Sequence, residues 1–163
     1  MLCLACSTAV AQFTFTEKSA TPFPRVERSS IAFSDVDGEK GPDVLITGWA
    51  GSKRIAKLYL NDGSGNFTEK TMGVDFPGVE YSSIAFADVD GENGPDVLIT
   101  GINNDFERIA KLYVNDGSGN FTEKTMGVDF EGVQYSSIAF ADVNKDGHQD
   151  VLITGQNNAS ERI

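Results

Sequence analysis

The amino-acid sequence predicts an all-β fold made of repeated antiparallel units. Val, Ile, Thr and Phe are frequent, and 17 of the 163 residues are Gly, which favours strands joined by turns. The chain also repeats itself, because residues 67–101 and 121–155 match at 27 of 35 positions with a period of 54 residues. A period of this length is typical of architectures in which one small unit is copied along the chain.

The middle copy shows four strand candidates most clearly. Residues 82–89 alternate Ile and Phe with Ala, a pattern that suits a strand packed on both faces. The runs 96–101, 108–115 and 121–126 are rich in β-branched and apolar residues, and Asn-Asp-Gly-Ser-Gly-Asn between the last two predicts a hairpin. A metal site in this hairpin is the less favoured interpretation, because its glycines already serve the turn. A four-stranded meander of about 50 residues, repeated, predicts the blade of a β-propeller, whereas the repeats of a β-solenoid are usually shorter.

The predicted strands do not fill a closed ring. We expect one strand at residues 13–18, four within 29–72, four within 82–126 and two within 136–163, which makes a partial β-propeller of about 2.7 blades. Residues 12–163 would form this repeat domain. The open ends predict a fragment of a longer propeller, an open arc, or self-assembly of several copies that completes the ring.

Residues 1–11 predict the remnant of a secretory signal peptide. They are apolar with small residues, and Ala-Val-Ala at 9–11 fits a cleavage site before Gln12; a buried first strand is the alternative. Cys3 and Cys6 lie in this segment, so the mature chain would have no cysteine that could form a disulfide. We therefore expect a secreted or cell-surface protein, and no later stretch predicts a transmembrane segment.

Acidic residues concentrate in three loops of nine residues, one in each copy. The chain carries 24 acids and 13 bases, and the three loops hold 11 of the acids. Without these 11 loop acids the remaining 13 acids would equal the 13 bases, so the loop acids account for the net charge of −11. The lack of a basic patch argues against a nucleic-acid partner. In each loop oxygen-bearing residues recur at every second position and then after a gap of four, which suits the six to eight or so oxygen ligands of Ca²⁺. The oxygen-bearing residues of the three loops are Asp35, Asp37, Glu39, Asp43, Asp88, Asp90, Glu92, Asp96, Asp142, Asn144, Asp146 and Asp150.

The stretch at 140–155, Phe-Ala-Asp-Val-Asn-Lys-Asp-Gly-His-Gln-Asp-Val-Leu-Ile-Thr-Gly, resembles the FG-GAP or VCBS repeat of integrin α-subunit propellers and of many secreted bacterial proteins. The resemblance covers nearly all of residues 13–163 and implies a fragment of a secreted bacterial member. It implies a β-propeller, commonly of seven blades, with one Ca²⁺ per blade that carries the motif and therefore up to three here. By this resemblance His148 would coordinate through its backbone carbonyl. The equivalent carbonyls of the first two loops would come from Gly41 and Gly94.

The first two loops depart from this pattern. Glu39 and Glu92 stand where the third loop has Asp146, and the longer side chain requires the backbone to retreat. We still expect Ca²⁺ in these loops, because four carboxylates within nine residues repel one another unless a cation neutralises them. Acidic turns without an ion are the alternative, and Mg²⁺ is less suited because it demands octahedral geometry.

These features predict a calcium-binding, secreted repeat module that serves as a structural, adhesion or protein-binding scaffold. No Ser–His or Cys–His set is evident, and His148 is the only histidine, so we expect no enzyme activity. The loops at 49–53, 102–107 and 156–161 vary most between the three copies. Two explanations are open: these loops recognise an extracellular protein or glycan, or their sequences have simply drifted. The alternatives are a lectin-like carbohydrate-binding propeller and the non-catalytic part of an extracellular polysaccharide-degrading enzyme. The arginines expected to form structural pairs before each third strand are Arg54, Arg108 and Arg162.

Overall fold

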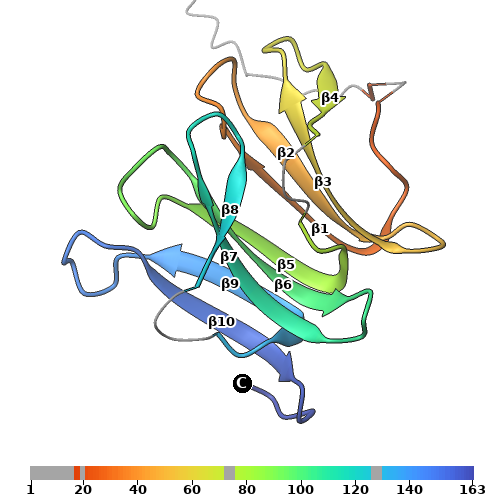
Figure 1. Ribbon diagram of the computed structural model, residues 1–163, viewed down its shortest axis with the longest axis vertical. Helices are drawn as coiled ribbons and strands as arrows, with labels where there is room; N and C mark the ends of the chain where they lie inside the picture. Colours follow the sequence, from red (N-terminus) through yellow and green to blue (C-terminus); the bar gives the residue numbers. More distant parts are fainter. Residues whose placement is uncertain (1–16, 19–20, 72–75, 126–129) are drawn as a thin grey trace, which may run out of the picture.

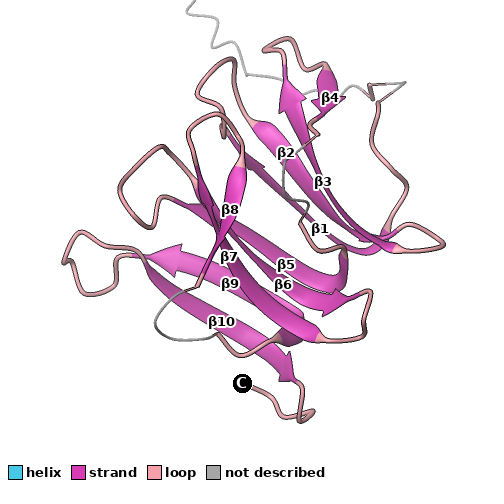
Figure 2. Cartoon of the chain, viewed as in Figure 1, coloured by secondary structure: helices cyan, strands magenta, loops and turns pink. Residues whose placement is uncertain are grey.

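Every regular element in the described part of the computed structural model is a β-strand (Figure 1, Figure 2). The strands form three successive units in which neighbouring strands run antiparallel. In the described part of the chain, no helix is long and apolar enough to cross a membrane. The signal peptide predicted at 1–11 and most of the strand predicted at 13–18 lie outside the described residues. The structure describes residues 17–18, 21–71, 76–125 and 130–163.

The observed strands agree closely with the predicted ones. The first unit contains β1 (Glu27–Ser34), β2 (Asp43–Trp49), β3 (Arg54–Asn61) and β4 (Phe67–Glu69). The second contains β5 (Val79–Ala87), β6 (Asp96–Asn103), β7 (Arg108–Asn115) and β8 (Phe121–Lys124). The third contains β9 (Val133–Ala141) and β10 (Asp150–Asn157). A single pairing of Ile55 with Val79 joins β3 to β5, so the first two units share one hydrogen-bonded sheet.

A bulge in the first strand of each unit explains why these strands begin earlier than predicted. The register of β5 against β6 shifts just after Glu80, where Tyr81 has a φ of 49°. The equivalent residues Arg28 and Tyr135 have φ values of 53° and 50°. The facing backbone can approach because Gly101 has no side chain, since a Cβ there would lie 2.9 Å from the Glu80 carbonyl oxygen. Bulky residues rarely take a positive φ, so the sequence pattern gave no reason to extend the strand across this point.

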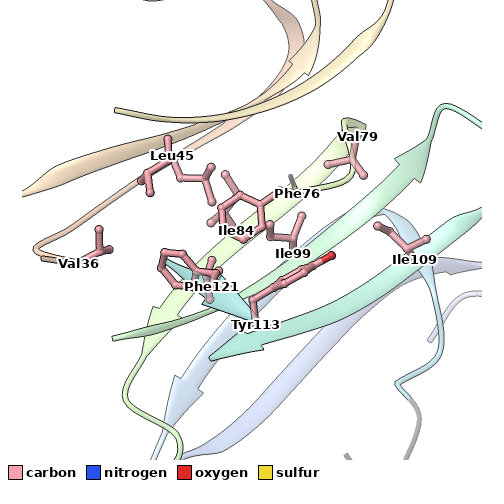
Figure 3. Packing of buried hydrophobic residues seen from close by; sticks show 11 residues of the cluster. Val36, Leu45, Phe76, Val79, Ile84, Ile99, Ile109, Tyr113 and Phe121 are labelled. Atoms are coloured by element: carbon pink, nitrogen blue, oxygen red, sulfur yellow. The ribbon is translucent and has the colours of Figure 1, made fainter. Parts of the chain in front are cut away.

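The three units stack face to face, as blades do around the axis of a propeller (Figure 1). Their first strands, β1, β5 and β9, lie side by side. Leu45 and Leu58 of the first unit share one hydrophobic core with Ile99 and Tyr113 of the second (Figure 3). Leu98 points to the opposite face of β6, because strand side chains alternate, and it is fully buried where β9 packs against β6. The described residues therefore form a partial, unclosed β-propeller, as the sequence predicts.

A phenylalanine in the connector before each complete unit fixes the outer strands. Phe76 packs edge-on against Tyr113 with the ring centroids 4.9 Å apart, and its ring lies 5.2 Å from that of Phe121. Phe23 makes the same two contacts in the first unit. Burial of one such ring contributes about 1.5–3 kcal/mol. These contacts hold the connector against the third and fourth strands of its unit.

Candidate metal sites

The loop between β1 and β2 brings three carboxylates together. Oxygen atoms of Asp35, Asp37 and Asp43 all lie within 4.8 Å of one another. Asp35 is exposed, Asp37 is half-buried, and Asp43 is only 1 % exposed. Anionic oxygens this close repel one another and attract a divalent cation. The same arrangement recurs in the loop between β5 and β6, where it is formed by Asp88, Asp90 and Asp96.

Backbone hydrogen bonds hold the buried carboxylate of each group. Asp43 Oδ2 accepts a bond from the N–H of Val36 at 2.9 Å, and its Oδ1 accepts one from the N–H of Asn61 at 2.8 Å. Asp96 accepts the equivalent two bonds, each at 2.9 Å. The buried aspartate thus ties its loop to the end of the third strand, and these bonds fix the orientation of its carboxylate.

The other two aspartates of each group shape the turn, and the glutamates do not join the group. Asp35 Oδ1 accepts a bond from the N–H of Gly38 at 2.8 Å, and Asp37 Oδ1 accepts one from the N–H of Glu39 at 3.1 Å. The second loop repeats both bonds. Among the described residues, the converging groups do not include the carboxylates of Glu39 and Glu92. The ligand roles expected for these glutamates and for the Gly41 and Gly94 carbonyls stay predictions.

The third loop carries the fullest motif but is arranged differently. Asp142 accepts bonds from the N–H groups of Asp146 at 3.1 Å and Gly147 at 3.0 Å, and Asn144 donates its amide N–H to Asp146 at 2.9 Å. Within the described residues Asp142, Asp146 and Asp150 do not form a converging group like the other two. The hairpin that donates to the buried aspartate in the first two units has no counterpart among the described residues of the third. Calcium binding at this loop, including the His148 carbonyl, stays a prediction.

Sequence reasoning missed the part that Asn115 plays. Its amide nitrogen donates to the Pro95 carbonyl at 3.2 Å and to the Val36 carbonyl of the preceding unit at 2.8 Å. Its amide oxygen accepts bonds from the N–H groups of Gly117 and Gly119 at 3.1 and 3.2 Å. One side chain therefore links the hairpin, its own acidic loop and the acidic loop of the neighbouring unit. The sequence signal for this role is the recurrence of Asn at the start of both hairpins. An Asn at that position is equally typical of an ordinary turn.

The aspartate inside each hairpin accepts hydrogen bonds that stabilise the turn. This favours the interpretation of the hairpin as a turn over its interpretation as a second metal site. Asp62 accepts bonds from the backbone N–H groups of Ser64 and Asn66 and from the Asn66 amide at 2.7 Å. The Asn66 side chain is the main reason that the pKa of Asp62 lies below its ordinary value. Asp116 has the same contacts and the same direction of pKa shift.

Arg54 forms a structural pair, as predicted. Its guanidinium donates to Glu80 of the next unit at 2.7 and 3.1 Å, and the two side chains are 7 % and 5 % exposed. The guanidinium also lies over the rings of Phe106 at 4.6 Å and Trp49 at 5.7 Å. Trp49 thus packs against a guanidinium of its own unit.

The pH dependence of the calcium-free protein should reveal the buried aspartates. Burial raises the pKa of Asp43 and of Asp96, two backbone hydrogen bonds oppose this shift, and the neighbouring aspartates add to it. The folded state then keeps protons that the unfolded state has lost. Stability should therefore rise as the pH falls from neutrality toward the ordinary Asp pKa of about 3.9. Chemical denaturation in calcium-free buffer checks this, and Asp43→Asn with Asp96→Asn should remove the trend.

The fold and the acidic loops define the class of protein: a repeat protein of propeller blades with an acidic loop between the first two strands of each blade. The FG-GAP-like repeat family matches residues 35–99 and 94–153. The chain therefore belongs to the FG-GAP-like repeat family, as the sequence motifs predict. Comparison with curated proteins and with solved structures gave no match.

Proposed function

We propose that the chain is a secreted, calcium-binding β-propeller module that serves as a scaffold for adhesion or for binding another protein. The observation that carries the proposal is the repeated convergence of three carboxylates at the same place in two successive units. One carboxylate of each group is buried and held by two backbone N–H groups. Burying such a charge is costly unless a cation compensates it.

The chemistry of the loops favours calcium over other metals. Every candidate side chain is an oxygen donor, and hard oxygen ligands in flexible loops suit Ca²⁺. Zinc and copper sites draw on sulfur and imidazole, and both cysteines lie in the predicted signal segment at 1–11. The bound ion would have a structural role, since Asp43 joins the start of β2 to the backbone of Val36 and Asn61.

The scaffold role rests on the family and on the surface opposite the acidic loops. FG-GAP-like repeats generally serve as non-catalytic structural and binding modules, and we propose no catalytic role for this chain. The loop after β6 is shaped by Asn103, whose amide oxygen accepts bonds from the N–H groups of Asp105 and Glu107. It presents Phe106, which is 72 % exposed. A large exposed aromatic ring on a firmly built loop is suited to contact an extracellular protein or glycan.

Isothermal titration of calcium into calcium-free protein tests the proposal. We expect two tighter sites, from the preorganised first and second loops, and a weaker third site that must first rearrange its turn bonds. Asp142→Ala with Asp146→Ala should remove the weaker site alone. Asp37→Asn with Asp90→Asn should remove the two tighter sites.

The hairpin aspartates provide the matched control for this titration. Asp62→Asn with Asp116→Asn changes the same residue type in nearby turns and should leave all the sites intact. Calcium heats that Asp37→Asn with Asp90→Asn leaves unchanged would contradict the assignment of the ion to these loops.

A further inference from the structure

We propose that Asn115 couples the acidic loops of the first two units, so that calcium bound by either loop strengthens calcium binding by the other. Figure 1 shows the hairpin between β7 and β8 beside the loop between β1 and β2. Asn115 ends β7 at the start of this hairpin and is only 5 % exposed. The coupling rests on the calcium-binding function proposed above, and it adds a regulation that independent loops would lack.

A continuous series of hydrogen bonds joins the buried aspartates of the two loops. The backbone N–H of Asn115 donates to Asp96 Oδ1 at 2.9 Å. The side-chain amide of the same residue donates to the carbonyl oxygen of Val36 at 2.8 Å. The N–H of Val36 in turn donates to Asp43 Oδ2 at 2.9 Å. Because Asp96 and Asp43 each converge with two further carboxylates, a restraint on one group is passed to the other through two residues.

Packing holds the first loop against the same hairpin. Val36 is 1 % exposed and belongs to the hydrophobic core that the first two units share (Figure 3). A Cβ added at Gly119 would lie 3.1 Å from Val36 Cγ2, so the hairpin backbone already stands close to this side chain. The Lys70 ammonium of the first unit also donates to the Ser118 carbonyl of the hairpin at 2.6 Å. The first loop and the hairpin of the second unit are therefore restrained together.

The direction of the coupling follows from the conformational freedom that a loop loses when it binds an ion. Asp96, once it ligates an ion, is restrained, and Asn115 passes this restraint to the backbone of Val36. The first loop then has less freedom left to lose when it binds its own ion, which gives positive cooperativity without a change of shape. Direct repulsion between two cations acts in the opposite sense and is screened beyond about 8–10 Å at physiological salt. An increase in affinity is therefore diagnostic of the hydrogen-bonded link.

Asn61 provides the matched comparison, because its side chain makes the same bonds within its own unit. The amide nitrogen donates to the Pro42 carbonyl at 3.1 Å, and the amide oxygen accepts the N–H groups of Gly63 and Gly65 at 3.0 and 3.1 Å. Within the part of the chain that the structure describes, this side chain makes no hydrogen bond to another unit. Asn115→Asp and Asn61→Asp both keep the acceptor, remove the amide donor and add one charge, and only the first breaks a bond between units.

Calcium titration of the 163-residue chain, followed by the NMR signals of the Val36 and Val89 amides, tests the coupling. Each of these amides donates to the buried aspartate of one loop, so each signal reports one site. Asp90→Asn should weaken calcium binding at the first loop at least about fivefold, and Asp37→Asn should weaken it at the second loop by about the same factor, because linkage is reciprocal.

The two asparagine variants separate the hydrogen-bonded link from simple charge effects. With Asn115→Asp present, each of these two losses should fall below about twofold, whereas with Asn61→Asp present each should persist. Hydrogen exchange gives a second readout: calcium added to the Asp37→Asn chain should slow exchange of the Val36 amide at least about fivefold, and Asn115→Asp should abolish this protection.

Gly119→Ala tests the same link if the added charge of Asn115→Asp prevents folding. Its Cβ would press on Val36 and so displace the first loop from the hairpin. Gly65→Ala is its matched control, because Gly65 has a similar φ of 75° against 69° at Gly119 and its Cβ would lie 3.5 Å from Lys18 Nζ, an exposed side-chain end. Gly119→Ala should reduce the coupling at least about twofold, and Gly65→Ala should leave it unchanged.

The possible results distinguish this coupling from the proposed function. Calcium binding at both loops with affinities that do not depend on each other would overturn the coupling and leave the proposed function standing. Absence of calcium binding at both loops would overturn the proposed function and the coupling with it. A coupling that persists in both Asn115→Asp and Gly119→Ala would overturn the role of Asn115, while circular dichroism confirms that each variant compared is folded.

Discussion

Removal of calcium is expected to lower the melting temperature of the chain by about 10–20 °C. A ligand that binds only the folded state at about 100 times its Kd contributes about 2.7 kcal/mol, so two such sites contribute about 5 kcal/mol. In a chain of this length each kcal/mol corresponds to about 2–4 °C. Without the ion, the buried carboxylates Asp43 and Asp96 each remain beside two other acids. Thermal unfolding followed by circular dichroism, with and without a chelator, measures the change.

Replacing one ligand in each loop isolates the effect of the ion from the effect of the turn. Asp37→Asn with Asp90→Asn keeps the side-chain oxygen that accepts the N–H of Glu39 or Glu92 but removes the charge. The variant should unfold near the temperature of the chelated wild type and should respond little to calcium. If calcium raises the melting temperature of this variant as much as that of the wild type, the ion does not bind in these two loops.

Arg54→Ala is expected to cost about 3–5 kcal/mol of unfolding free energy. The change leaves Glu80 5 % exposed at the interface between the first two units, with Arg28 as its remaining partner at 3.0 Å. It also removes the cation that lies over the Phe106 ring at 4.6 Å. Urea denaturation measures the loss. A cost below about 1 kcal/mol would show that this pair does not hold the interface.

The neighbouring interface supplies the matched comparison for this pair. Arg108 faces Gln134. When the Gln134 amide is oriented with its oxygen toward Arg108, this oxygen accepts hydrogen bonds from the guanidinium at 3.0 and 3.2 Å. Glu80→Gln should therefore lower the unfolding free energy by less than half as much as Arg54→Ala. The reason is that Gln134, which occupies the position of Glu80 in the next unit, already pairs with an arginine through an amide. Lys57→Ala breaks an exposed pair with Glu69 and should cost less than about 1 kcal/mol.

Most of the fold could be predicted because alternation along each strand reports which faces are covered. Ile84 and Ala85 differ in size because they face different neighbours, and this pattern survives in a single sequence. The bulge at Tyr81 could not be predicted, since its φ of 49° depends on the backbone of β6 approaching across Gly101. Local propensity disfavours that conformation, and only the tertiary contact maintains it.

The candidate site was predictable in its position and less so in its geometry. Spacing identified Asp35, Asp37 and Asp43 as neighbours, because residues in one short loop have little freedom to separate. It could not show that Glu39 lies outside the group, because the reach of a side chain depends on the turn that carries it. Nor could it show the contribution of Asn61, whose backbone N–H reaches Asp43 from 18 residues away.

The Asn115 amide bears on the order in which the chain is completed during synthesis. Its bond to the Val36 carbonyl joins residues 79 positions apart. Chains emerge from the ribosome at their N-terminal end and fold as they emerge. The first acidic loop therefore lacks this hydrogen bond until the hairpin of the following blade has been translated. The acidic loop of the first blade is therefore completed only after the second blade has been made.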